Sequence, residues 1–131
     1  MNVTQDIYER ISELRRGALA TFCELLTINN RAGLTTTIGD NTSHVMNTWQ
    51  GANGGSSIIL PPVAESHGRI IKFHSDSTIS ANTYVTLAIN TGDTGVTIDG
   101  AATYNFNRAY DGITILGHTD NNWYIIQKKE K

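Results

Sequence analysis

The sequence has few of the residues that most often carry recognisable chemistry. Its 131 residues include a single cysteine, Cys23, which excludes an intramolecular disulfide framework and a cysteine-based zinc cluster. No apolar run approaches the roughly 18 residues of a membrane-spanning helix, so we expect no membrane segment. The ten lysines and arginines are scattered apart from a short basic tail, and the net charge is −2. We therefore expect no nucleic-acid partner, because a surface that follows phosphates is strongly basic.

Motifs for catalysis and metal binding are also missing. The four histidines form no His-x-His or His-Glu-x-x-His pair, and the acidic residues are dispersed. Cys23 follows Phe22 and is better explained as a small buried hydrophobic residue than as a nucleophile. We therefore expect no enzymatic activity, no cofactor and no metal site. One alternative stays open, in which a trimer brings three copies of His74, close in sequence to Asp76, around an axial ion.

The chain does begin with a segment of helical periodicity. Apolar residues of the segment 3–26 recur at spacings of three and four, with a mean period of about 3.67 residues. This pattern predicts an amphipathic α-helix whose nearly straight seam needs a partner. The seam consists of Val3, Ile7, Ile11, Leu14, Ala18, Phe22 and Leu25. Because the pattern ends in the Asn- and Gly-containing segment 29–33, we assign residues 1–33 to a helix and linker and residues 34–131 to a β-domain.

The β-domain is predicted from segments in which apolar and polar residues alternate, a period of two residues. Threonine, serine and asparagine make up more than a quarter of the chain, and turn residues separate short alternating segments. The expected strands are 35–38, 57–60, 69–74, 83–89, 95–98, 103–106, 112–116 and 122–127. Short strands at this spacing predict an antiparallel β-sandwich or barrel. The expected fold class is therefore mainly β, with an N-terminal amphipathic helix ahead of that domain.

Five short pieces follow one another in the β-domain. They are IILPP (58–62), GRIIKF (68–73), VTIDG (96–100), YDGITI (110–115) and NNWYII (121–126). As an ordered set they resemble the small trimeric β-domain of tailed-bacteriophage fibre, head-fibre and capsid decoration proteins. In that family a strand ending in Leu-Pro leads to a Gly-Lys/Arg-x-Ile strand, and an Ile-Asp-Gly turn and a closing Asn-Trp-Tyr strand follow. The chain has no repeated shaft, which favours a short fibre or a decoration protein.

The resemblance implies a non-enzymatic homotrimer on the surface of a virion. Its helices would associate or dock on the particle, and its β-domains would face outward. The implied partners are further copies of the chain and phage capsid or tail proteins, after synthesis in the host cytoplasm. The alternative function is a carbohydrate-binding adhesin that attaches the particle to host surface glycans. In that case exposed Trp49, Tyr104 or Tyr110 would stack on a sugar face.

The helical seam leads to a first testable prediction. Ile11→Asp places a charge in the middle of the seam and is expected to abolish trimers or particle attachment, because an unpaired buried charge is costly. Mass measurement in solution and co-sedimentation with particles follow the two effects. Intact trimers that still attach would instead assign the seam to packing against the chain's own β-domain.

Overall fold

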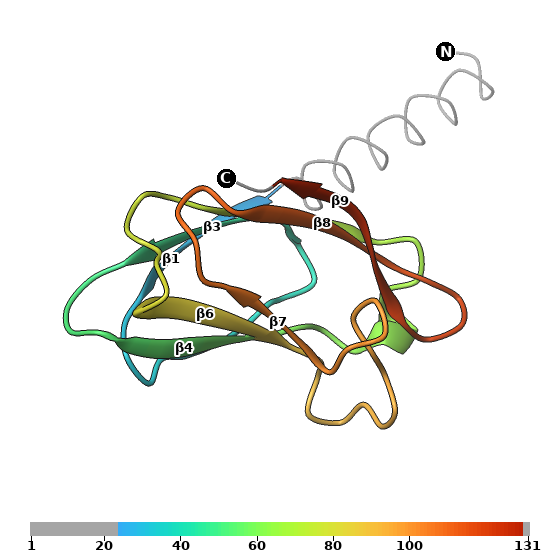
Figure 1. Cartoon of the computed structure of the whole chain (residues 1–131). Coiled ribbons are helices and arrows are strands. Elements are labelled where there is room, and N and C mark those ends of the chain that lie inside the picture. The colour runs from blue at the N-terminus through green and yellow to red at the C-terminus, as the bar shows by residue number, and fades with distance from the viewer. Residues whose placement is uncertain (1–23, 130–131) are drawn as a thin grey trace, which may run out of the picture.

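Two β-sheets face each other in this computed structural model, which describes residues 24–129 (Figure 1). The larger sheet contains, in spatial order, β1 (Glu24–Asn30), β3 (Thr42–Trp49), β5 (Ile70–Ser75), β8 (Gly112–Gly117) and β9 (Trp123–Lys129). The smaller sheet contains β2 (Thr35–Thr37), β4 (Gly54–Ile59), β6 (Thr83–Ala88) and β7 (Thr103–Phe106). A short 3₁₀ turn, η1 (Val63–Glu65), lies between β4 and β5. No helix within the described residues is long and apolar enough to cross a membrane.

From β1 to β6 the chain alternates between the two sheets (Figure 1). β1, β3 and β5 pair in parallel in the larger sheet, and β2, β4 and β6 do so in the smaller sheet. A parallel pair needs a crossover connection, and here each crossover contains a strand of the opposite sheet. β7, β8 and β9 then join in antiparallel orientation. The mainly β class is confirmed, but the antiparallel pairing expected for a sandwich or barrel is wrong, because both sheets are mixed.

The hydrophobic core lies between the sheets and comes from the inward-facing residues of each strand. In β6, Val85 and Leu87 are fully buried, whereas Thr86 between them is partly exposed. Phe73 of the larger sheet and Phe106 of the smaller sheet meet with ring centroids 5.7 Å apart. Burial of each large apolar side chain contributes roughly 1.5–3 kcal/mol, so contacts of this kind hold the two sheets together.

Buried polar side chains also link the sheets. Asn30 Oδ1, at the end of β1, accepts a hydrogen bond from Ser56 Oγ of β4 at 2.6 Å. Asn30 Nδ2 donates to Asn47 Oδ1 of β3 at 3.2 Å. All three side chains are buried, and buried polar groups are costly unless they are paired. These hydrogen bonds therefore favour one alignment of β1, β3 and β4.

The structure corrects the expected elements at the start of the chain. Residues 24–30, expected to end a helix and enter a linker, form β1, which pairs with β3 along its length. The larger sheet therefore starts ahead of the expected boundary between residues 33 and 34. Leu25 lies on this strand and is 63% exposed, so it is not part of a helical seam. The other seam residues, from 3 to 22, lie outside the described residues.

Two further strands differ from expectation. β3 is not predicted by the sequence pattern, because buried Asn47 occupies an inward position and interrupts the apolar alternation. Residues 95–98, expected to be a strand, contribute only isolated bridges at Ile98. The helical pattern around Leu25 and Leu26 fails because pairing with β3 outweighs local periodicity.

Trp123 closes the core at the start of β9. Its side chain is fully buried. Its backbone N–H donates to the Thr97 carbonyl at 2.9 Å, and its backbone carbonyl accepts from the Asp99 N–H at 2.8 Å. At Gly117, a Cβ atom would come within 3.3 Å of the indole and 2.1 Å of the Ser66 carbonyl oxygen. Glycine at this position therefore permits the close approach of β8 to the segment before β5.

Gly117→Ala is expected to lower the free energy of unfolding by about 1–3 kcal/mol, because the added methyl group must displace the backbone at Ser66. Gly39→Ala is the matched control, since nothing lies within 4 Å of its Cβ position. This control should change stability by less than about 0.5 kcal/mol. Urea unfolding measures both variants, and equal stabilities would contradict a tight contact at Gly117.

Candidate functional site

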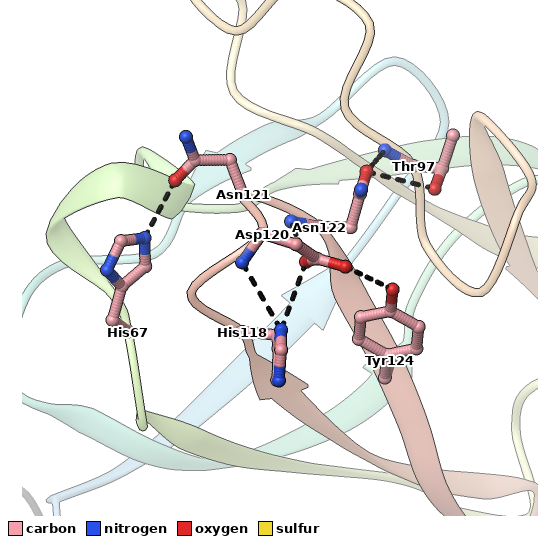
Figure 2. A network of polar contacts seen from close by, with 7 residues as sticks. All are labelled: His67, Thr97, His118, Asp120, Asn121, Asn122 and Tyr124. Carbon is pink, nitrogen blue, oxygen red and sulfur yellow. Dashed lines mark hydrogen bonds and ion pairs between the residues drawn. The ribbon is translucent and has the colours of Figure 1, made fainter.

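A polar network holds the loops at one end of the two-sheet structure (Figure 2). Its centre is the turn between β8 and β9, residues 118–122. The turn contacts His67, in the loop before β5, and Thr97, in the loop before β7. Segments far apart in the sequence are therefore joined by hydrogen bonds at this end.

Asp120 organises the turn. Its Oδ1 atom accepts a hydrogen bond from the Asn122 N–H at 3.0 Å, and its Oδ2 atom accepts one from the Tyr124 hydroxyl. The His118 Nδ1 atom accepts from the Asp120 N–H at 3.2 Å, and the His118 and Tyr124 rings meet edge to face at 5.6 Å. The hydrogen bond from Tyr124 lowers the pKa of Asp120 because it stabilises the carboxylate, and the same bond raises the pKa of Tyr124.

Asn121 and Asn122 connect this turn to the other loops. Asn122 Oδ1 accepts hydrogen bonds from the Thr97 N–H at 2.9 Å and from the Thr97 hydroxyl at 3.2 Å. Asn121 has a φ of 63°, in the left-handed region that asparagine tolerates, and its Oδ1 lies 2.7 Å from His67 Nε2. Asparagine at both positions thus serves the turn geometry and the contacts between loops.

A hollow of about 680 Å³ lies beside this network and is lined by Asp40 and the segment 65–70. Arg69 fixes one wall, because its Nη2 atom donates to the carbonyl oxygens of Gly39 at 2.5 Å and Thr42 at 2.7 Å. Burial lowers the pKa of Arg69, and the Asp40 carboxylate opposes that shift. The acidic residues Asp40 and Glu65 line the hollow together with Arg69, so its charge does not favour an anion.

The hydrogen bonds of the network are largely satisfied within it. Both carboxylate oxygens of Asp120 and the side-chain oxygens of Asn121 and Asn122 have partners in the three loops or in β9. The network therefore orders this end of the molecule. Within residues 24–129, no three His, Cys, Asp or Glu side chains are grouped so that they could hold a metal ion. An axial ion at His74 involves several copies of the chain and stays a prediction.

The three aromatic residues considered for glycan contact lie at the opposite end, where β8 begins. Trp49 is only 8% exposed and its Nε1 donates to the Ala52 carbonyl at 3.0 Å, so the expectation that it is exposed is wrong. Tyr104 is half-buried, and its hydroxyl donates to Asp111 Oδ2 at 3.2 Å. Burial, together with this carboxylate, raises the pKa of Tyr104. Tyr110 is 46% exposed and, of the three, has the ring most open to a ligand.

The outer face of the larger sheet carries exposed apolar side chains next to the network. Ile70 of β5, Leu116 of β8 and Tyr124 of β9 are successive partners in the strand register, and we call them the apolar row. Ile70 is 45% exposed and Tyr124 is 37% exposed, with Leu116 partly exposed between them. Ile126 lies at an irregularity of the β8–β9 pairing and is 51% exposed. This surface is the best candidate for contact with another protein.

The sequence pattern predicts the turn at 120–122 but not the apolar row. A local signal for the row exists, because each of its residues is next to a fully buried apolar residue of the same strand. Those buried neighbours are Ile71, Ile115 and Trp123. Strands with apolar residues on both faces have a second surface to cover, and only the pairing of the strands places the three outward residues side by side.

No protein family model matches the chain, and no curated protein matches it. The functional proposals below therefore depend on the residues and their geometry.

Tyr124→Phe is expected to raise the pKa of Asp120 toward its ordinary value, because the variant removes the hydroxyl that stabilises the carboxylate. The depressed pKa contributes stability above the unfolded-state pKa, and that stability is lost as the pH falls through the folded-state pKa. An NMR titration of the Asp120 carboxyl group measures the change, with Tyr84→Phe on the other sheet as the control. An unchanged pKa in Tyr124→Phe would assign the shift to the turn backbone instead.

Proposed function

We propose that this protein is a non-enzymatic structural protein of a tailed-bacteriophage particle, acting as a homotrimeric short fibre or capsid decoration protein. The observation that carries the proposal is the exposed apolar row, Ile70, Leu116 and Tyr124, on one face of the larger sheet. Contiguous apolar surface on a soluble domain commonly marks a contact with another protein. The occupant that we propose is another copy of the same chain.

The apolar row suits a contact between copies. Its side chains lie next to one another across three strands, so one partner surface can cover all of them. Burial of each would contribute up to roughly 1.5–3 kcal/mol. Among the described strands, β9 is an edge of the larger sheet, and edge strands have backbone groups that can pair with another chain. Both features favour association.

The pieces that resemble the phage β-domain support the virion assignment. Four of the five are neighbours in space: GRIIKF pairs with YDGITI in the β5–β8 ladder, and YDGITI pairs with NNWYII in the β8–β9 ladder. VTIDG joins them through the bridge between Ile98 and Trp123. These four pieces therefore form one packed unit, which is what a shared domain would require.

On a particle, many copies would turn weak contacts into firm attachment. Linked binding events can gain a factor of about 10²–10⁴ in affinity without any new contact. In this proposal the N-terminal seam joins copies or docks on capsid or tail proteins, and the β-domains face outward. Assembly onto the virion surface follows synthesis in the host cytoplasm.

Ile70→Asp is expected to weaken self-association of the full chain by at least about tenfold, because it places a charge at one end of the apolar row. Thr27→Asp is the matched control, since it adds the same charge on the outer face of the same sheet, on β1 at the far edge. Analytical ultracentrifugation over a range of concentrations gives the oligomeric state of both variants and of the unaltered chain.

A chain that stays monomeric at the highest concentration would contradict the trimer. Equal weakening by both variants would move the interface away from the apolar row. The virion assignment has a separate test, a reconstruction of the purified phage particle. Density for clustered β-domains on the head or tail supports the proposal, whereas absence of the protein from purified particles rejects it.

A further inference from the structure

The outer face of the larger sheet changes from apolar to basic along its strands. Beyond the apolar row, toward the start of β8, it bears a shallow groove of about 280 Å³. The long polar side chains around it are His44, Lys72, His74, Gln127 and Lys129. We call this feature the basic groove. It lies at the opposite end of the strands from the polar network of Figure 2.

Strand register explains the shape of the basic groove. Lys72 of β5, Thr114 of β8 and Gln127 of β9 are successive partners, so a short side chain lies between two long ones. Neighbouring strands are about 4.8 Å apart, which places β5 and β9 about 10 Å from each other. That width accommodates one oxyanion together with hydrogen bonds from both sides.

The next row repeats this arrangement with glycine in the middle. His74 of β5 and Lys129 of β9 flank Gly112 of β8. A Cβ atom at Gly112 would lie 2.9 Å from the Phe73 carbonyl oxygen and 3.3 Å from His74 Nδ1. The absence of a side chain at Gly112 therefore leaves the floor open between the two basic residues.

All of the ionisable side chains that line the basic groove are basic. On the β3 side, His44 is the register partner of Lys72, and its Nδ1 lies 2.7 Å from Ser43 Oγ. Beyond β3, β1 places uncharged Leu25 opposite His44, and its one acidic residue, Glu24, pairs outside this row with Thr42. The whole chain has a net charge of −2, so the positive charge of the groove is opposite in sign to that of the protein as a whole.

We propose that the basic groove binds a single oxyanion, a sulfate, phosphate or carboxylate group, carried by a saccharide. Lys72 and Lys129 supply positive charge from opposite sides, and lysine binds such groups as a point charge. The Gln127 amide and the Thr114 hydroxyl can donate to and accept from neighbouring sugar hydroxyls. This assignment goes beyond the assembly role and depends on other residues.

A single oxyanion fits the charge distribution better than a polyanion. Binding of a nucleic acid or another polyanion depends on many cationic contacts spread along a surface. Here the basic residues are confined to one small groove on a protein of net charge −2. A longer polyanion would extend onto surface of the unfavourable sign, whereas one charged group on a neutral saccharide would not.

Titration of the full chain with charged and neutral saccharides tests the proposal. The probes are N-acetylglucosamine 6-sulfate, N-acetylglucosamine 6-phosphate and a galacturonic acid trisaccharide, with N-acetylglucosamine as the neutral counterpart. We expect NMR shifts at Gly112 and Thr114 with at least one charged probe and none with the neutral one. The affinity should fall as salt is added, because exposed charges are screened. Inorganic phosphate distinguishes the sources: weaker binding than the sugar phosphate indicates a saccharide ligand, and equal binding indicates a free anion.

The double variant Lys72→Gln/Lys129→Gln should lose at least about tenfold in affinity, since both charge-assisted contacts are removed. Lys72→Arg/Lys129→Arg keeps the charges and should retain binding. Arg31→Gln/Arg108→Gln removes two exposed charges outside the groove and is the matched control.

Failure of every charged probe to bind overturns the proposal. So does a loss of affinity in Arg31→Gln/Arg108→Gln equal to that in Lys72→Gln/Lys129→Gln. Single-stranded DNA that binds more tightly than every saccharide would overturn the saccharide assignment. A monomeric protein that still binds the probes would separate this inference from the proposed trimer.

Discussion

Burial of Trp123 is the constraint on which much of the remaining structure depends. Its indole is inside the core, and its backbone N–H and carbonyl are hydrogen-bonded to the segment 97–99. These contacts fix the position of the start of β9. The start of β9 in turn determines where the turn between β8 and β9 lies. Hydrogen bonds from this turn then position the loops that contain His67 and Thr97. Because side chains alternate along a strand, an inward Trp123 also directs Tyr124 outward.

The consequence is a sheet face with two different surfaces on the same strands. Near the loops the outward residues of β5, β8 and β9 form the apolar row, and farther along they form the basic groove. The two proposals therefore place assembly and ligand binding next to each other. Copies joined through the apolar row would present their basic grooves together, and repeated weak oxyanion contacts would then add through avidity.

The parallel winding from β1 to β6 explains why an antiparallel sandwich was the natural prediction from the sequence. Short alternating strands separated by turn residues look the same whether the next strand joins the same sheet or the opposite one. The choice is made by contacts between distant residues, such as the buried Asn30 side chain that bonds to both Ser56 and Asn47. An inward polar residue of this kind, Asn47, is also the reason that β3 is not predicted, since it breaks the apolar alternation on which strand prediction depends.

The sequence by itself determined the mainly β class, the positions of strands such as β6 and β7, the turn at 120–122 and a structural role for Trp123. These features follow from local alternation, turn chemistry and the size of one apolar side chain. Only the tertiary structure decided that residues 24–30 form a strand, that Trp49 is buried, and that the apolar row and the basic groove exist. Each of these depends on which strands are neighbours, and pairing between residues far apart in the chain leaves no periodic signal in the sequence.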